Sequence, residues 1–156
     1  MSSAPEIQFR VECRKVRFER LKLKRVLRRL LAEHGRTSGL LSIAVVDDKA
    51  IHALNREFLE HDEPTDVITF PLDDDAEPFG EIVLSAETAH REANARGIES
   101  ERELALYAIH GALHLVGYDD TSSAERRKMK ARERRYLGVF DGDCDSEDVV
   151  APPPIL

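Results

Sequence analysis

The sequence has few of the features that mark secreted or membrane-spanning proteins. Among its 156 residues are only two cysteines, Cys13 and Cys144, which lie far apart and form no Cys-x-x-Cys pair. No run of about 18 apolar residues is present, which argues against a helix that crosses a membrane. The first residues, MSSAPEIQF, lack the charged start and apolar core of a secretory signal. We therefore expect a reduced, cytoplasmic protein with no membrane partner.

The sequence also has no overall excess of positive charge, since its formal net charge is −7. Residues 141–156 contain five acidic residues and no Lys or Arg, so this segment carries −5 and the preceding 140 residues carry −2. The same segment is rich in proline and poor in apolar residues, so we expect it to be disordered. We predict one folded domain over residues 1–140, which is long enough to bury its own core, and an acidic tail over 141–156.

Hydrophobic periodicity predicts four strands and five helices. The strands are expected over residues 6–14, 40–47, 66–72 and 80–85, and the helices over 19–34, from Asp47 or Asp48 to Phe58, from Ser85 to near Gly97, from Ser100 to Gly117, and over 122–137. Ser85 is a predicted cap, and Ser100 with Glu103 forms a predicted capping box. The order β-α-β-α-β-β-α-α-α predicts an α/β (α+β) fold with a mixed, mostly parallel four-stranded sheet.

The most informative stretch is the end of the fourth predicted helix, where His110 and His114 are four residues apart. Two histidines at this spacing lie on one face of a helix and can reach one ion. Gly117 permits the left-handed backbone that ends the helix and turns the chain, and the turn can bring Asp120 to the same ion. We therefore predict a zinc site formed by His110, His114 and Asp120, with an open position for catalysis.

Two other interpretations of this stretch remain open. The histidines could simply lie half-buried between the helix and the sheet. The spacing also matches the HExxHxxGxxH and HExxHxxGxxD zinc peptidases at all but one position, where Gly111 replaces the glutamate that serves as general base. Because glycine cannot accept a proton from water, the sequence disfavours peptide hydrolysis by that route.

Three ordered blocks resemble the YbeY family of bacterial rRNA maturation factors. They are LNREFLEHDEPTDVITFPL (54–72), GEIVLSAETA (80–89) and HGALHLVGYDD (110–120). The resemblance implies a single-domain α/β fold with a zincin-like metal site and one zinc ion. It also implies a single-strand-specific, metal-dependent endoribonuclease with roles in 16S rRNA 3′-end maturation and ribosome quality control.

The sequence departs from the family pattern at two places. The family motif HGxLHLxGYDH ends in a histidine, whereas this sequence has Asp120, another residue type that binds zinc. In the family pattern LNxxYRxxDxPTDV, the tyrosine and arginine correspond to Phe58 and Leu59 here. An arginine there would suit a phosphate, and Arg56, one helical turn earlier, is a candidate substitute.

Two basic runs bear on the expected partner. Residues 14–29 contain nine Lys or Arg, and residues 126–135 contain seven. A charge run is usually a solvated helix face, but two runs beside a nuclease-like site favour RNA contacts. We expect rRNA and the small ribosomal subunit as partners, and no DNA. The leading hypothesis is an endoribonuclease; the alternatives are a ribosome-assembly factor with little or no catalysis and, less favoured, a metallopeptidase.

Overall fold

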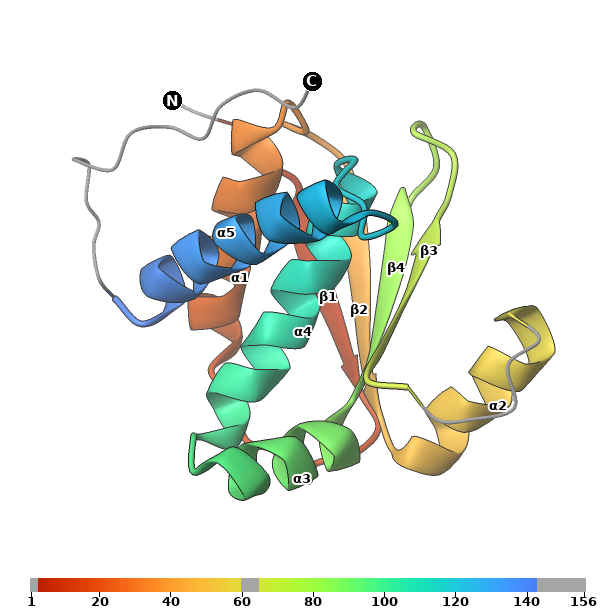
Figure 1. Cartoon of the computed structure of the whole chain (residues 1–156). Helices are drawn as coiled ribbons and strands as arrows, with labels where there is room; N and C mark the ends of the chain where they lie inside the picture. Colours follow the sequence, from red (N-terminus) through yellow and green to blue (C-terminus); the bar gives the residue numbers. More distant parts are fainter. Residues whose placement is uncertain (1–2, 60–64, 143–156) are drawn as a thin grey trace.

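The computed structural model describes residues 3–59 and 65–142, and there it has four strands and five helices (Figure 1). The strands are β1 (Glu6–Val11), β2 (Leu40–Val46), β3 (Val67–Pro71) and β4 (Gly80–Ser85), and the helices are α1 (Arg20–Glu33), α2 (Asp48–Leu59), α3 (Ala86–Arg96), α4 (Ser100–Leu115) and α5 (Ser123–Phe140). The predicted element order is confirmed. All but the first two residues of the predicted tail, 141–156, lie outside the described residues.

The four strands form one mixed sheet in the order β1-β2-β4-β3. Strands β1, β2 and β4 are parallel, whereas β3 is antiparallel to β4. Parallel neighbours need a crossover connection, which α1 provides between β1 and β2. The short segment 72–79 joins β3 to β4 and allows them to pair as an antiparallel hairpin. The predicted mostly parallel sheet is therefore confirmed.

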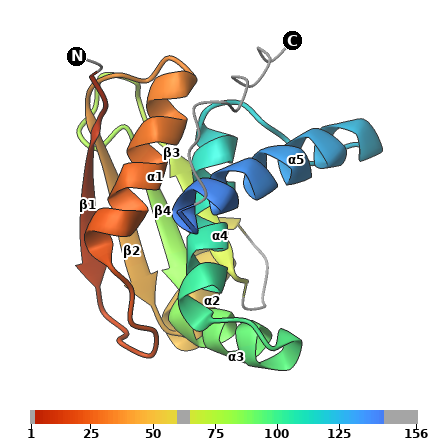
Figure 2. The ribbon, with the colours of Figure 1, turned by 90° about the vertical axis from the view of Figure 1, so that its left-hand side faces the viewer.

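Both faces of the sheet are covered, which explains why β2 is almost wholly apolar. Leu41, Ile43 and Val45 of β2 belong to the main core, which packs against α1, α4 and α5. Ala44 and Val46 point to the opposite face, into a smaller core closed by α2. Figures 1 and 2 show α5 lying across α1 and α4, on the side away from the sheet. This crossing places the start of α5 beside the end of α4.

The predicted helix caps have different outcomes. Ser85 caps α3 as expected, because its Oγ accepts a hydrogen bond from the Thr88 backbone N–H at 3.1 Å. The predicted capping box is wrong: α4 begins at Ser100 itself, and its N-cap residue, Glu99, makes no side-chain cap. Glu103 is instead buried and pairs with Arg96. The Glu103 carboxylate thus binds the Arg96 guanidinium rather than a backbone N–H at the start of α4.

The described residues give no sign of a membrane-crossing element. Within 3–59 and 65–142, no helix combines the length and the apolar character that crossing a bilayer requires.

Candidate metal centre

The two histidines of α4 face each other near the C-terminal end of the helix. Most of α4 is buried, and Leu106, His110 and His114 form a partly exposed strip along it. His110 and His114 are both half-buried there, and their Nε2 atoms lie 3.2 Å apart. The ring centroids are 4.7 Å apart and the rings are nearly perpendicular. Both nitrogens therefore point toward one shared position.

The turn after α4 brings Asp120 to the histidines. Gly117 has φ 109°, a conformation that glycine adopts without strain. The backbone N–H of Tyr118 donates to the carbonyl of Leu113 at 3.0 Å, which closes the turn. Asp120 Oδ2 then lies 3.9 Å from His114 Nε2, and the three ligand atoms all lie within 4.8 Å of one another. The convergence expected from the sequence is present.

Tyr118 anchors this turn to the rest of the fold. Its side chain is buried, and its hydroxyl lies 3.2 Å from Nε2 of His34, the C-cap residue of α1. Nδ1 of His34 lies 2.8 Å from the Leu30 carbonyl, so it can donate to that oxygen, which leaves Nε2 to accept from Tyr118. Burial raises the pKa of Tyr118, which keeps the hydroxyl protonated as a donor. The position of Asp120, two residues later, thus depends on α1.

Glu133 of α5 contacts His110 on the ring nitrogen that does not face His114. Its Oε2 lies 2.5 Å from His110 Nδ1, and the residue is only 6% exposed. Such a carboxylate keeps the proton on Nδ1 and leaves Nε2 free to bind a metal. Sequence reasoning missed this residue, because Glu133 lies in the basic run 126–135. The signal was available, since Glu133 is the single acidic residue in that run.

A second carboxylate fixes α5, the helix that carries Glu133. Glu33, the last residue of α1, accepts hydrogen bonds from Tyr136 at 2.5 Å and from Arg135 at 3.2 Å. Burial raises the pKa of Glu33, but hydrogen bonds from Tyr136, Arg29 and Arg135 outweigh it, so the net pKa is lowered. The ionised carboxylate therefore joins α1 to α5.

Gly111 allows α4 to pack closely on the sheet. A Cβ atom at this position would lie 2.7 Å from Ile82 Cγ2 and 3.1 Å from Thr69 Oγ1. A side chain at position 111 would therefore be directed against β4 and β3, and a glutamate would not fit without displacing them. This contact gives the glycine a structural role and counts against the metallopeptidase alternative.

A cavity of about 370 Å³ opens beside the candidate metal ligands. Its volume lies in the range of small-molecule sites. It is lined by residues from the start of β3, the end of α3, the middle of α4, the following turn and α5: Asp66, Val67, Arg96, Glu103, Leu106, Tyr107, His110, Asp120, Arg126, Met129, Lys130 and Glu133. Arg56, the phosphate contact predicted from the sequence, lies in the last turn of α2 and is not among these lining residues. Its role stays a prediction.

The donor set fits zinc in both type and spacing. Imidazole nitrogens and a carboxylate oxygen are common zinc ligands, and Zn–N bonds of about 2.0–2.1 Å put two nitrogens of a tetrahedral site about 3.3–3.4 Å apart. The observed Nε2–Nε2 separation of 3.2 Å is close to that value. Three protein ligands leave one position open, as in catalytic rather than structural sites.

Comparison with known proteins shows which family this fold belongs to. A family model described as "Endoribonuclease YbeY" matches residues 7–141. A protein of that name from Carboxydothermus hydrogenoformans is 44% identical over 112 residues, which are 70% of this chain and 78% of the relative. Another, from Geobacter metallireducens, is 34% identical over 128 residues, or 77% of this chain and 85% of the relative.

A solved structure matches over nearly the whole fold. The solution structure of TM1509 from Thermotoga maritima superposes with a TM-score of 0.64 at 27% identity, covering 89% of this chain and 90% of the other. The resemblance drawn from the three sequence blocks is therefore confirmed. The chain belongs to the YbeY family of endoribonucleases.

Proposed function

We propose that this protein is a zinc-dependent endoribonuclease that cuts single-stranded RNA. The observation that carries the proposal is the convergence of His110, His114 and Asp120 within 4.8 Å, at the edge of a cavity that also contains basic side chains. The names of the relatives support the nuclease activity. In this proposal the substrate is precursor rRNA, the process is 16S 3′-end maturation and ribosome quality control, the partner is the small ribosomal subunit, and the location is the cytoplasm.

Each residue near the ligands has a distinct task. His110, His114 and Asp120 would hold the ion, and Glu133 would keep the proton on Nδ1 of His110 so that Nε2 stays a ligand. When bound, zinc supplies a Lewis acid for phosphoryl oxygens and makes water a nucleophile near neutral pH. Asp120 makes the site more negative than a third histidine would, so nearby cations are needed to attract a phosphodiester.

Two residues of α5 supply those cations in the cavity. Arg126 Nη1 donates to the backbone carbonyl of Asp120 at 3.3 Å, which places its guanidinium beside the candidate ligand. Lys130, one turn further along α5, is exposed and pairs with no group in the described part of the chain. Both are positioned to bind phosphate oxygens and to stabilise the negative charge that develops during cleavage. In this proposal Arg126 and Lys130 compensate for the loss of the family arginine, whose position Leu59 occupies. Arg56 is predicted to contribute a further phosphate contact.

The proposal is tested by RNA cleavage with metal-replete protein. A labelled single-stranded rRNA fragment should be cut, and cleavage should stop with a chelator and in the His114→Ala and Asp120→Ala variants. Asp119→Ala is a matched control, because Asp119 is a neighbouring carboxylate outside the candidate ligand set. Equal cleavage by all three variants would contradict the proposed ligands, and a duplex cut as fast as the single strand would contradict the proposed specificity.

A second candidate function is a zinc-containing ribosome-assembly factor with little catalysis. Leu59, which replaces the family arginine, favours it, because this side chain is 43% exposed and cannot bind a phosphate. Tight binding of rRNA without cleavage, by protein that contains one zinc ion per chain, would support this function over the nuclease.

A further inference from the structure

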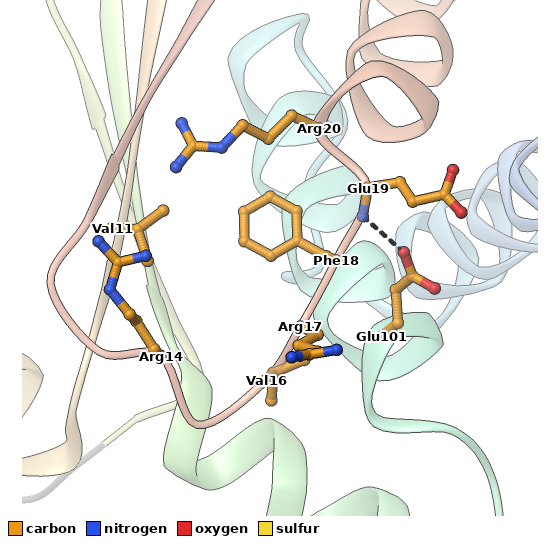
Figure 3. Close-up of a pocket in the computed structure, with 8 residues that line it drawn as sticks. All are labelled: Val11, Arg14, Val16, Arg17, Phe18, Glu19, Arg20 and Glu101. Carbon is orange, nitrogen blue, oxygen red and sulfur yellow. Dashed lines mark hydrogen bonds between the residues drawn. The ribbon is translucent and has the colours of Figure 1, made fainter.

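A second group of positively charged side chains lies away from the candidate metal centre. A concave surface of about 750 Å³ lies where the segment after β1 enters α1. It is lined by Val11, Arg14, Val16, Arg17, Phe18, Glu19, Arg20 and Glu101 (Figure 3). We call it the arginine pocket. None of its residues lines the cavity beside the metal ligands.

Its arginines are available to a ligand. Arg14 and Arg17 are exposed and form no hydrogen bond or ion pair with any group in the described ranges 3–59 and 65–142. Arg20 lies 5.8 Å from the centre of the Phe9 ring, which orients its guanidinium without neutralising it. The one acidic contact in Figure 3 is internal, since Glu101 Oε2 accepts a hydrogen bond from the backbone N–H of Glu19 at 2.8 Å.

The arginines lie on the approach to α1. Arg14 and Arg17 belong to the segment between β1 and α1, and Arg20 is the first residue of the helix, whose first turn contains no acidic residue and presents partial positive charge. The N-cap, Glu19, makes no side-chain cap. The carboxylates of Glu19 and Glu101 also line the pocket, and Glu101 already accepts the backbone N–H of Glu19. The three arginines outnumber these two carboxylates, so the pocket can still attract a ligand that carries negative charge.

The pocket also offers an aromatic surface. The Phe18 ring is half-buried, packs edge-on against Phe9 with centroids 5.3 Å apart, and lies among the three arginines in Figure 3. A ring next to guanidinium groups suits a nucleic-acid base next to its phosphates. An inorganic anion would use the charges alone, so the ring favours a polynucleotide.

Helix α5 runs from the candidate metal centre toward the start of α1. At one end of α5, Arg126 lies beside Asp120. At the other end, the Phe140 ring lies 4.2 Å from Nζ of Lys22, two residues after Arg20. The distance along the helix from residue 126 to residue 140 is about 21 Å. Exposed basic residues, including Arg127 and Arg134, lie along α5 between these ends.

We propose that the arginine pocket is a second RNA-binding site that holds phosphates of the substrate strand several nucleotides away from the bond that is cut. This inference rests on the proposed nuclease function. Arg14 and Arg17 bind the phosphates, and Phe18 stacks on a base. The site raises the affinity for long strands and takes no part in the chemical step.

The test compares RNA strands that differ in length. An oligonucleotide of about four nucleotides fits one site, whereas one of about 20 can reach both. The Arg14→Ala/Arg17→Ala variant of the full-length, zinc-loaded protein should bind the longer strand about 3- to 10-fold more weakly. The slope of log affinity against log salt should fall by about 1.4, because two phosphate contacts are lost. The kcat/KM for cleavage of the shorter strand should be unchanged, because that strand is cut only when it lies beside the candidate metal ligands.

Two further variants keep this test specific. Arg17→Lys keeps the charge and should retain most of the salt dependence. Lys49→Ala removes a cation from α2, on another part of the surface, and should leave the affinity for both strands unchanged. Thermal unfolding should show that all variants fold. Equal affinity and salt slope for the double variant and the unaltered protein would overturn the inference.

Binding and cleavage separate this inference from the proposed function. Fluorescence anisotropy measures binding even if no RNA is cut, with the RNA checked for integrity afterwards. If the protein does cut RNA, the double variant should raise KM for the longer strand and leave kcat unchanged. Cleavage by the double variant with an unaltered KM would overturn the second site but not the nuclease. Binding that depends on the arginine pocket, without any cleavage, would overturn the nuclease but not the second site.

Discussion

His110 and Glu133 show how a single neighbour changes what a histidine can do. A histidine on a half-buried helix face is usually only a packing residue, which is the plain interpretation that the sequence left open. The contact of 2.5 Å between Glu133 Oε2 and His110 Nδ1 fixes the tautomer and directs Nε2 toward His114. A buried carboxylate in this position is typical of a histidine that binds metal.

Glu133→Gln should weaken zinc binding about 10- to 100-fold while preserving the fold, because the amide supports His110 less strongly than a carboxylate does. Competition with a chromophoric chelator measures the affinity. Glu125→Gln is the matched control, since Glu125 lies on α5 outside the cavity. An unchanged zinc affinity in Glu133→Gln would show that the contact does not support the metal site.

Gly111→Ala should destabilise the protein by about 1–3 kcal/mol, because the added methyl group would lie 2.7 Å from Ile82 Cγ2. The intrinsic preference of helices for alanine offsets part of this cost. Urea unfolding measures the change. A gain in stability would mean that α4 does not pack on β4 as closely as described.

At the scale of the elements, Asp48 joins the start of α2 to the start of α3. Its carboxylate accepts hydrogen bonds from Ser85 Oγ at 2.6 Å, Thr88 Oγ1 at 2.7 Å and Arg91 Nη1 at 2.8 Å. Burial raises the pKa of Asp48, but these three donors outweigh it, so the net pKa lies below the usual 3.8. The folded state therefore favours the ionised form.

This pKa shift predicts how stability depends on pH. Because the pKa is lower in the folded state, the stabilisation is fully present above about pH 4 and is lost as the pH falls through the folded value. Asp48→Asn should lower the free energy of unfolding at neutral pH and weaken its fall with acid, as measured by urea unfolding at several pH values. Asp73→Asn is the control, because Asp73 is exposed in the segment that joins β3 to β4. If the free energy of unfolding of Asp48→Asn fell with acid as steeply as that of the unaltered protein, the prediction would be contradicted.

The elements also show what sequence patterns can and cannot predict. Local periodicity was sufficient for the nine elements within residues 3–59 and 65–142, and the His110–His114 spacing with Gly117 was sufficient for the convergence of Asp120. Contacts between distant segments were not predicted. Nothing in the local pattern places Glu133 behind His110, and Glu103 has the spacing of a capping residue but pairs with Arg96. The partners of these two glutamates depend on how the helices pack against one another, which local sequence patterns do not specify.

Across the whole molecule, the candidate metal ligands depend on three helices at once. Helix α4 carries the histidines, the turn that carries Asp120 is anchored to α1 through Tyr118 and His34, and α5 supplies Glu133. Glu33 then ties α1 to α5. Because the ligands converge only when these helices are packed, metal binding and folding should be coupled.

Zinc should therefore raise the thermal stability of the protein. A ligand that binds only the folded state adds about 2.7 kcal/mol at a free concentration 100 times its Kd. The Tm, followed by calorimetry at increasing zinc concentration, should rise for the unaltered protein and stay nearly constant for His114→Ala. An equal rise for both proteins would indicate binding elsewhere.

The most direct test of the central claim is the zinc content of protein purified without added metal. Elemental analysis should find about one zinc ion per chain, and anomalous scattering should place it between His110, His114 and Asp120. His114→Ala should lose most of this zinc. A full zinc complement in that variant, or an anomalous peak away from these three residues, would contradict the claim that they form the metal centre.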